Sequence, residues 1–420
     1  MARFRFRRRF TRRALGAVLV WTSFVLGNAG RSDGAESTLV IENARVIVGN
    51  GEVKRGVRVV IKGDRIASVG KQAAPAGAKT IDARGMTLMP GLIDAHVHLL
   101  VRVSSTGQKA TRQFLKDKLP KKLSNFLSSG VTTIKSTADP IGLILPVRKQ
   151  LRAGELKGPR LLVVGPAFTS TGGHPAVSIC RSNPWCREQV CAEVDDRASA
   201  IKAVRSLVDR KVDALKIVYD GNRSGRTKLP LNVMKAIIDE GHRHKLRVTV
   251  HTGTQQDALD AISAGADGLE HGVFLGRIAG DDVGDLMKKR GTFYVPTLTV
   301  WRTFSRSGNF PRAQANLQGL HRQGVKIAVG TDTFGSIEPG VSTIRELELM
   351  VEAGLSPSDA LQAATQSAAE HLGRAKDLGT VEPGKIADLI LVDGDPLKDI
   401  SALHSVKIVV QSGRVVHESD

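Results

Sequence analysis

Aromatic side chains make up only 4% of this 420-residue chain, so aliphatic side chains must supply most of any core. Hydrophobic residues reach 41% and charged residues 24%, as in ordinary soluble globular proteins. Neither a short repeat nor a low-complexity segment occurs. A barrel of about 250 residues with one smaller module would account for the length.

Nucleic-acid-binding motifs are also lacking, although the formal net charge is +20. Basic residues are not interleaved with aromatic ones, as they are in many nucleic-acid-binding proteins. Seven of the arginines lie in residues 1–29, which contain no acidic residue. The remaining basic excess favours anionic surfaces and solutes without specificity, so no specific nucleic-acid partner is expected.

Only one long apolar run is present, Ala14–Leu26, and it is shorter than the about 20 residues that a membrane span needs. It follows the arginine-rich start and precedes the small residues Gly27–Gly30, the order typical of a signal peptide. The segment Thr11–Leu15 (TRRAL) also resembles a twin-arginine signal. We therefore expect residues 1–29 to engage the export machinery and the mature protein to be periplasmic or secreted; an uncleaved membrane anchor is the alternative.

Cysteine is rare, and Cys180, Cys186 and Cys191 form no CxxC pair, which argues against a structural zinc site. In an exported protein two of the three are expected to form a disulfide. We prefer Cys180 with Cys191, because this pair closes the larger loop. Three free thiols packed beneath the loop are the alternative.

Both ends of the chain show short strand patterns separated by Gly, Asn-Gly and Ser-Gly turns. These patterns predict one small β-sandwich domain built from residues 38–88 together with residues 375–420. The strand patterns lie at residues 38–48, 57–62, 65–69, 80–82, 388–392, 406–411 and 414–417.

The middle of the chain, residues 89–374, alternates strand and helix patterns. Helices are expected at residues 195–211, where the apolar positions have helical spacing, and after Ser356-Pro357, a good N-cap and first position. No dinucleotide-binding GxGxxG follows the first strand, so an α/β fold of the (β/α)8 TIM-barrel type is favoured over a Rossmann fold. The eight strand candidates are residues 91–98, 131–136, 160–165, 214–219, 247–252, 268–271, 292–297 and 325–332.

Six possible metal ligands occupy positions in or at the ends of these strands. His96 and His98 are two residues apart, so in a strand both side chains point to the same side. Taken singly, each residue could be a hydrogen-bonded histidine, a solvated lysine or a helix cap. Their coincidence at one mouth of a barrel predicts a metal centre. The six residues are His96, His98, Lys216, His251, His271 and Asp332.

Several motifs resemble those of the amidohydrolase superfamily with two metal ions, over roughly residues 38–417. Lys216 and Thr169–Pro175 (TSTGGHP) are most similar to the branch of imidazolonepropionases and prolidase-like dipeptidases. The motifs that carry the resemblance are Met89–His98 (MPGLIDAHVH), Val250-His251-Thr252, Gly265–Gly272 (GADGLEHG), Gly330-Thr331-Asp332 and Gly379–Pro396.

The resemblance implies roles for these residues. His96, His98 and Asp332 would hold one divalent metal ion, His251 and His271 a second, and Lys216, carboxylated by CO2, would bridge the two. Zinc is the expected metal, with manganese, cobalt, nickel and iron as alternatives. Asp332 would also be the catalytic acid and base.

The expected substrate is a small amide, such as a dipeptide or an N-acyl amino acid. His174, Tyr219, Arg223 and Arg226 follow the third and fourth strands and are candidates for binding it, although they could be ordinary loop residues. The alternatives are a cyclic-amide, lactone or ester hydrolase on the same fold, or a binding protein without catalysis. A homo-oligomer also remains open.

Overall fold

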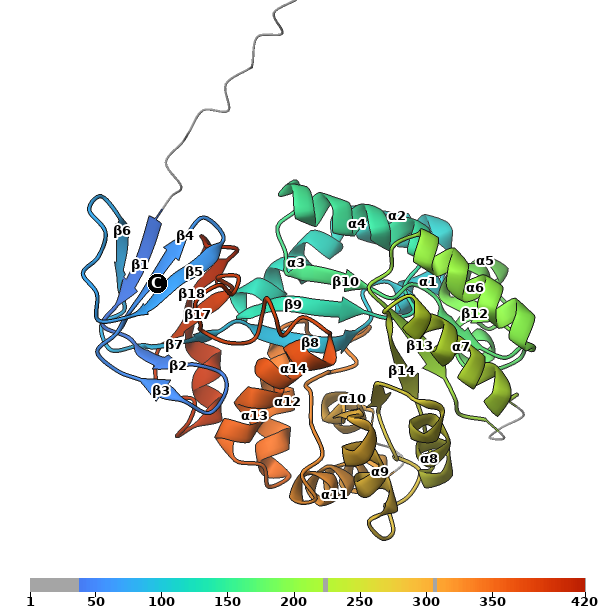
Figure 1. The fold of residues 1–420 in the computed structure, drawn as a ribbon. Helices are drawn as coiled ribbons and strands as arrows, with labels where there is room; N and C mark the ends of the chain where they lie inside the picture. Colours follow the sequence, from blue (N-terminus) through green and yellow to red (C-terminus); the bar gives the residue numbers. More distant parts are fainter. Residues whose placement is uncertain (1–37, 222–225, 305–307, 420) are drawn as a thin grey trace, which may run out of the picture. The chain divides into compact units, whose positions relative to one another are not determined.

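Strands from both ends of the chain form two facing sheets. The computed structural model describes residues 38–221, 226–304 and 308–419. One sheet has the order β5-β4-β1-β6 and the other β19-β18-β17-β7-β2-β3 (Figure 1). Their strands are β1 (Thr38–Glu42), β2 (Arg45–Ile47), β3 (Val53–Lys54), β4 (Arg58–Lys62), β5 (Arg65–Gly70), β6 (Lys79–Asp82), β7 (Thr87–Pro90), β17 (Leu389–Val392), β18 (Val406–Gln411) and β19 (Arg414–Glu418).

The two sheets share one hydrophobic cluster, which makes them a sandwich. Ile41 and Ile61 enter this cluster from the first sheet, and Leu88 and Leu389 enter it from the second. Strand β7 pairs with β17 from the far end of the sequence and leads, after Gly91, directly into the first barrel strand. The sandwich is therefore joined to the base of the barrel through β7.

The barrel strands run parallel to their neighbours, in the orders β10-β9-β8 and β12-β11-β13-β14-β15-β16. The third strand is interrupted between β10 and β11, where Gly165 has a φ of +79° and Pro166 lacks an N–H for the ladder. The strands are β8 (Leu92–Val97), β9 (Val131–Ser136), β10 (Arg160–Val163), β11 (Ala167–Thr169), β12 (Cys191–Glu193), β13 (Ala214–Val218), β14 (Arg247–His251), β15 (Gly268–Glu270) and β16 (Phe293–Val295).

The eighth strand differs from the prediction. Residues 325–332 form no continuous strand but an irregular segment that closes the ring through hydrogen bonds on both sides. The Ala328 amide donates to the Tyr294 carbonyl at 3.0 Å, and the Ala95 amide donates to the Val329 carbonyl at 2.9 Å. Asp332 has a φ of +55°, which a strand cannot accommodate. The predicted α/β barrel is therefore confirmed, with its last strand reduced to isolated bridges.

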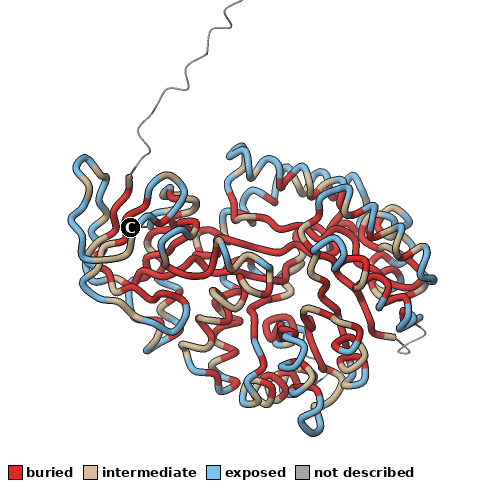
Figure 2. The backbone as a smooth tube through the Cα atoms, in the orientation of Figure 1, coloured by how far each residue is buried: buried red, intermediate tan, exposed pale blue. Residues whose placement is uncertain are grey.

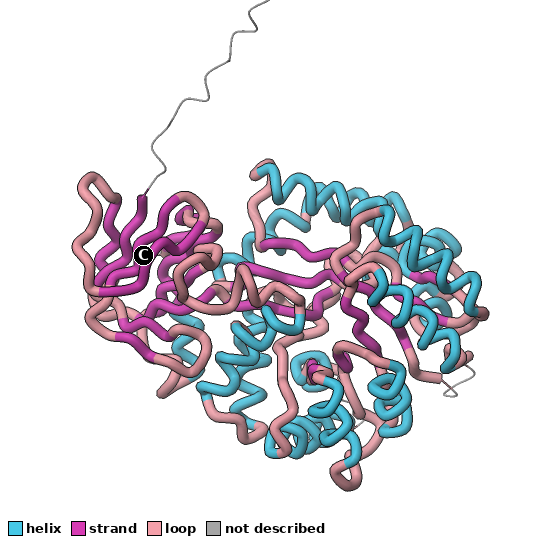
Figure 3. Tube along the Cα trace, in the orientation of Figure 1, coloured by secondary structure: helices cyan, strands magenta, loops and turns pink. Residues whose placement is uncertain are grey.

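Helices surround the barrel strands (Figure 3), and the strands are buried along most of their length (Figure 2). The two predicted helices are present as α6 and α13; the Asp196 and Ser356 side chains cap them. The helices are α1 (Val101–Ser104), α2 (Gln108–Asp117), α3 (Leu119–Ser128), α4 (Ile141–Ala153), η1 (Ala176–Cys180), α5 (Pro184–Val190), α6 (Arg197–Asp209), α7 (Leu231–Arg243), α8 (Gln255–Ala264), α9 (Asp282–Arg290), α10 (Leu298–Thr303), α11 (Asn309–Arg322), α12 (Val341–Glu352), α13 (Pro357–Ala363), α14 (Gln366–His371) and η2 (Ile400–Ser405).

Within the described ranges, no helix is both long enough and apolar enough to cross a membrane. The predicted signal peptide, residues 1–29, lies outside the described residues.

A disulfide is present, but its pairing differs from the preferred one. Cys180 bonds to Cys186, with 5.2 Å between the Cα atoms, and Cys191 is a free, buried thiol. Cys180 ends η1, and α5 turns back so that Cys186 lies beside it. Cys191 instead begins β12, which pairs with β11 in the barrel sheet. Strand pairing thus holds Cys191 in the sheet, so the disulfide joins Cys180 to Cys186 and closes the smaller of the two loops.

One free thiol per chain is therefore expected after denaturation without reductant, and three after reduction. In the native protein the remaining thiol should react slowly, because burial raises the pKa of Cys191 to about 12 and keeps it protonated. Titration with a chromogenic thiol reagent, with and without denaturant, measures both. Three reactive thiols in the denatured, unreduced protein would contradict the disulfide.

Candidate active site

Three histidines and an aspartate meet where the barrel strands end. Nε2 of His98 lies 3.0 Å from Oδ1 of Asp332 and 3.2 Å from Nε2 of His96. Nδ1 of His271 lies 3.7 Å from Oδ2 of Asp332. His96, His271 and Asp332 each offer one ligand atom, and these atoms lie within 4.8 Å of one another. The structure thus brings four of the six predicted ligands into one cluster.

The backbone at the strand ends turns these side chains inward. His271 and Asp332 have φ values of +65° and +55°, a left-handed conformation that residues other than glycine adopt rarely and often at functional sites. Two glycines allow the close approach. A Cβ on Gly272 would lie 2.0 Å from the Tyr294 ring, and one on Gly330 would lie 2.8 Å from Cβ of His96. The glycines of the HG and GTD motifs are therefore steric requirements of the cluster.

The cluster needs a cation at its centre. Nδ1 of His98 lies 2.7 Å from the Thr137 carbonyl, to which it must donate because a carbonyl only accepts. Nε2 then faces the Asp332 carboxylate and the His96 ring, so a proton or a metal ion must lie among these three groups. Burial opposes protonation of His98, but Asp332 prevails and raises its pKa. Burial likewise opposes ionisation of Asp332, but His98 prevails and lowers the pKa of Asp332.

The other two histidines of this cluster are held neutral. Burial lowers the pKa of His96 well below its usual value, and the charge of Lys216 adds to this effect. Burial also lowers the pKa of His271, with His251 as the next cause. Because a metal binds the neutral imidazole, both rings are in the form that a ligand requires.

His251, which ends β14, is next to this cluster. Its ring centroid lies 4.6 Å from that of His271, and its Nε2 lies 3.4 Å from Oδ2 of Asp220. Nε2 of His251 is buried without a hydrogen-bond partner. Since an unsatisfied buried polar atom is unfavourable, such atoms next to a carboxylate fit a metal site. Imidazole and carboxylate donors suit zinc and other transition metals.

Lys216 lies beneath the histidines in a buried charged group that also contains Lys135 and Glu270. Its Nζ contacts Oε2 of Glu270, while Nζ of Lys135 lies 2.6 Å from the other oxygen. Oε2 of Glu270 also lies 3.1 Å from Nδ1 of His96. Burial lowers the pKa of Lys135 to about 7. Burial also lowers the pKa of Lys216 well below its usual value, and the charge of Lys135 adds to this shift.

Lys135 and Glu270 were missed by the sequence interpretation. Both lie in predicted barrel strands, β9 and β15, whose other residues are mostly uncharged. A charged side chain inside such a strand is rarely buried without a partner of opposite charge. Lys135 therefore indicated a buried acid, and Glu270 indicated a buried base.

The proposed substrate-binding residues lie in different places. His174 lines the cavity above the cluster; its ring centroid lies 5.3 Å from that of His251, and burial lowers its pKa to about 3. The Tyr219 hydroxyl instead donates to Asp260 at 2.9 Å, so this residue does not line the cavity. Burial opposes ionisation of Asp220, but His251 outweighs it and lowers the pKa of Asp220, and Arg226 adds a smaller contribution. Arg223 lies outside the described residues.

The cavity above the cluster has a volume of about 300 Å³. The metal-ligand candidates form its floor, and most of its remaining wall is apolar. Phe304 and Phe334 stack in that wall with ring centroids 5.3 Å apart and an interplanar angle of 8°. The apolar lining residues include Val101, Ile179, Val300, Trp301, Phe304 and Phe334. The cavity is therefore suited to a small ligand with an apolar part and a polar group at the floor.

Sequence comparisons agree with this architecture. The family model described as "Amidohydrolase family" matches residues 87–416. Ochratoxinase of Aspergillus niger is 29% identical over 372 residues, which cover 77% of this chain and 73% of the relative. Imidazolonepropionase of Caldanaerobacter subterraneus subsp. tengcongensis is 26% identical over 394 residues, with 85% of each chain covered.

Solved structures with the same fold include two enzymes. A Xaa-Pro dipeptidase with methionine bound in its active site superposes with a TM-score of 0.79 at 28% identity, covering 91% of this chain and 100% of the other. The crystal structure of A. niger ochratoxinase gives a TM-score of 0.79 at 26% identity, with coverages of 91% and 96%.

Proposed function

The chain belongs to the amidohydrolase family, and from this premise we propose that it is a metal-dependent hydrolase that cleaves an amide bond in a dipeptide or an N-acyl amino acid. One observation carries the proposal: His96, His98, His271 and Asp332 converge at the floor of a cavity whose remaining wall is mostly apolar. The similarity to a Xaa-Pro dipeptidase supports the substrate class.

His96, His98 and Asp332 would hold one divalent metal ion, and His251 and His271 would hold a second. Lys216 would bridge them as a carbamate, because its burial favours the neutral amine that adds CO2. Zinc is the metal that this donor set suits best. Bound at this position, the metal ions would lower the pKa of a water molecule and polarise the substrate carbonyl.

The chain's own residues supply the proton transfer. Asp332 is ionised, so it accepts the proton of the attacking water and then delivers it to the leaving nitrogen. The Thr137 carbonyl fixes the ring of His98, and His98 in turn orients Asp332. The aromatic wall formed by Trp301, Phe304 and Phe334 excludes bulk water and holds the apolar part of the substrate.

A second candidate function is hydrolysis of a cyclic amide. It is favoured by the similarity to imidazolonepropionase, which extends over 85% of both chains. The same metal ligands and the same Asp332 would serve, since ring opening also requires water to attack a carbonyl.

The test is a hydrolysis screen of metal-reconstituted protein, with metal content measured on the same sample. The panel contains Xaa-Pro and other dipeptides, N-acyl amino acids, cyclic amides and lactones. We expect two metal ions per chain, hydrolysis of an open-chain amide, and reversible loss of activity on chelation. Protein that binds no metal after reconstitution would refute the proposal, and activity restricted to cyclic substrates would favour the second candidate.

We also propose that the protein is exported, on the basis of the arginine-rich start and the apolar run Ala14–Leu26. The mature chain is expected to begin near Gly30 and to be found outside the cytoplasm. Cell fractionation followed by N-terminal sequencing measures both. A soluble cytoplasmic protein with Met1 intact would contradict export, and a membrane-bound protein with Met1 intact would indicate an uncleaved anchor.

A further inference from the structure

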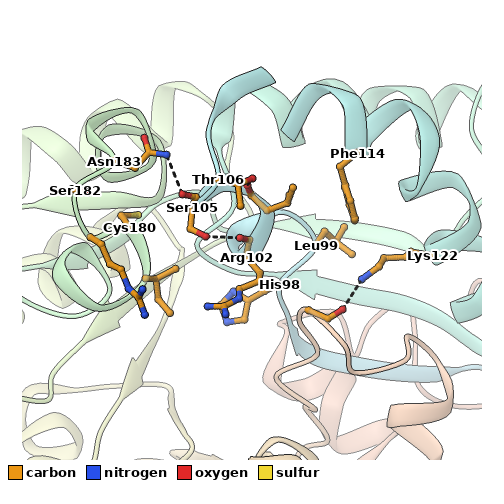
Figure 4. Close-up of a pocket in the computed structure, with 14 residues that line it drawn as sticks. His98, Leu99, Arg102, Ser105, Thr106, Phe114, Lys122, Cys180, Ser182 and Asn183 are labelled. Carbon is orange, nitrogen blue, oxygen red and sulfur yellow. Dashed lines mark hydrogen bonds between the residues drawn. The ribbon is translucent and has the colours of Figure 1, made fainter. Parts of the chain in front are cut away.

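A second cavity, with a volume of about 450 Å³, adjoins the candidate active site (Figure 4). The two cavities share His98, Arg102 and Ile179 in their walls. These three side chains therefore border both cavities, which lie next to each other. No proposed metal ligand other than His98 lines this second cavity.

The walls of the second cavity are tied together by specific contacts. The side-chain amide of Asn183 donates to the carbonyl of Ser105 at 3.2 Å, which connects the loop after η1 to the segment containing α1 (Figure 4). Oδ1 of the same residue accepts from the Cys186 amide at 3.1 Å. The disulfide between Cys180 and Cys186 closes this loop. Two segments far apart in the sequence therefore form one braced site.

The lining of the second cavity is strongly basic. Arg102, Lys122 and Arg181 line it, and none of its described lining residues is acidic. Nζ of Lys122 donates to the Gly335 carbonyl at 3.4 Å. Burial lowers the pKa of Lys122, and the charge of Glu338 opposes this shift. The guanidinium groups of Arg102 and Arg181 have neither an ion-pair partner nor a hydrogen-bond acceptor within the described ranges. The two arginines, rather than Lys122, are therefore free to bind an anion.

The backbone of Arg181 adds to this argument. Its φ is +52°, in the left-handed region that favours glycine. A residue other than glycine is disfavoured there, and such positions cluster at functional sites. Glycine would be less strained at this position, so a binding role for the side chain in the basic cavity accounts for the arginine there.

We propose that the second cavity binds a carboxylate of the substrate through Arg102 and Arg181. Because a guanidinium pairs with both oxygens of a carboxylate, two of them at one cavity select an acidic group. Leu99, Val103 and Phe114 supply apolar wall for the carbon chain between this carboxylate and the scissile amide. The substrate class is thus an amide that carries a carboxylate several bonds from the scissile bond, such as an N-glutaryl amino acid. The assignment of the amide rests on the proposed function, but carboxylate binding does not.

The first test measures binding, so its outcome does not depend on hydrolysis. Glutarate is titrated calorimetrically into metal-loaded protein, into Arg102→Gln/Arg181→Gly, and into the control Arg290→Gln, which changes an exposed arginine at the end of α9. We expect the affinity to fall by roughly tenfold or more in the double variant only. Equal affinities for all three proteins would overturn the proposal, because glutarate would then bind elsewhere, for example at the metal ions.

Arg181→Gly also separates binding from folding. Glycine relieves the left-handed conformation, so this single variant should melt no lower than the unchanged protein while it binds glutarate more weakly. A lower melting temperature together with unchanged binding would overturn the role of Arg181.

The second test compares kcat/KM for N-glutaryl-leucine and N-butanoyl-leucine. We expect a preference for the glutaryl substrate that falls in the double variant and persists in Arg290→Gln. A ratio that is the same in all three proteins would contradict the inference. If neither amide is hydrolysed, the proposed function fails, and the calorimetric result still decides whether the second cavity binds a carboxylate.

Discussion

Replacing Asp332 with asparagine is expected to lower kcat/KM for amide hydrolysis by roughly a thousandfold or more. A positioned general acid or base typically contributes about 10²–10⁴-fold, and this carboxylate would also be lost as an anionic ligand. Asparagine preserves the shape of the side chain, so His98 and His271 keep a polar neighbour within 4 Å. Steady-state kinetics on the metal-reconstituted variant measure the loss.

Asp285→Asn is the matched control, because Asp285 is exposed on α9, away from the cavity. It should retain full activity and full metal content. Metal analysis of Asp332→Asn then separates two roles: a large loss of activity at full metal occupancy indicates proton transfer, and a parallel loss of both indicates that Asp332 acts mainly as a ligand. Activity within a few-fold of the unchanged protein would remove Asp332 from the mechanism.

The parts of the fold that depend on local patterns were predictable. Strand and helix spacing placed the barrel strands and α6, and Ser356-Pro357 marked the start of α13, because these signals act over a few residues. The irregular closing segment was not predictable. The apolar pattern of residues 325–332 suggested a regular strand, whereas in the structure this segment forms separate hydrogen bonds to the strands on both sides. The Cys180–Cys186 pairing was missed for a similar reason, because strand pairing fixes Cys191 elsewhere.

The residues of the candidate site divide in the same way, into those that a local pattern predicts and those that meet only after folding. His96, His98, His251 and His271 were found because each lies at or next to the end of a strand, where a barrel gathers side chains at one mouth. Asp332 was found because it ends the irregular segment that takes the place of the eighth strand.

Other parts of the site depend on residues that meet only after folding. Lys135 and Glu270 are 135 positions apart, and the second cavity is formed by segments on either side of the third strand. No local pattern specifies such a meeting. The direction of the Tyr219 side chain was not predictable either, because a side chain that follows a strand can still point toward a neighbouring helix, as its bond to Asp260 in α8 shows.

Lys216→Ala is expected to leave about one metal ion per chain and to abolish most of the hydrolytic activity. Removing this side chain takes away the bridge between the two proposed metal positions. It should not unfold the protein, because Lys135 remains 2.6 Å from Glu270 and still balances the buried carboxylate. Metal analysis, kinetics and thermal melting of the same preparation measure the three quantities.

A carbamate bridge, unlike an amine ligand or a structural lysine, predicts that a small carboxylic acid can replace it. Formate or acetate should enter the space left in Lys216→Ala, supply the missing oxygen ligands, and restore part of both metal content and activity. The control Lys289→Ala, on the exposed end of α9, should show neither the loss nor a response to these acids. Two metal ions per chain in Lys216→Ala without added acid would show that no bridge is needed. A loss of metal that no carboxylic acid reverses would leave Lys216 only the role that the buried contacts already give it, as a partner of Glu270.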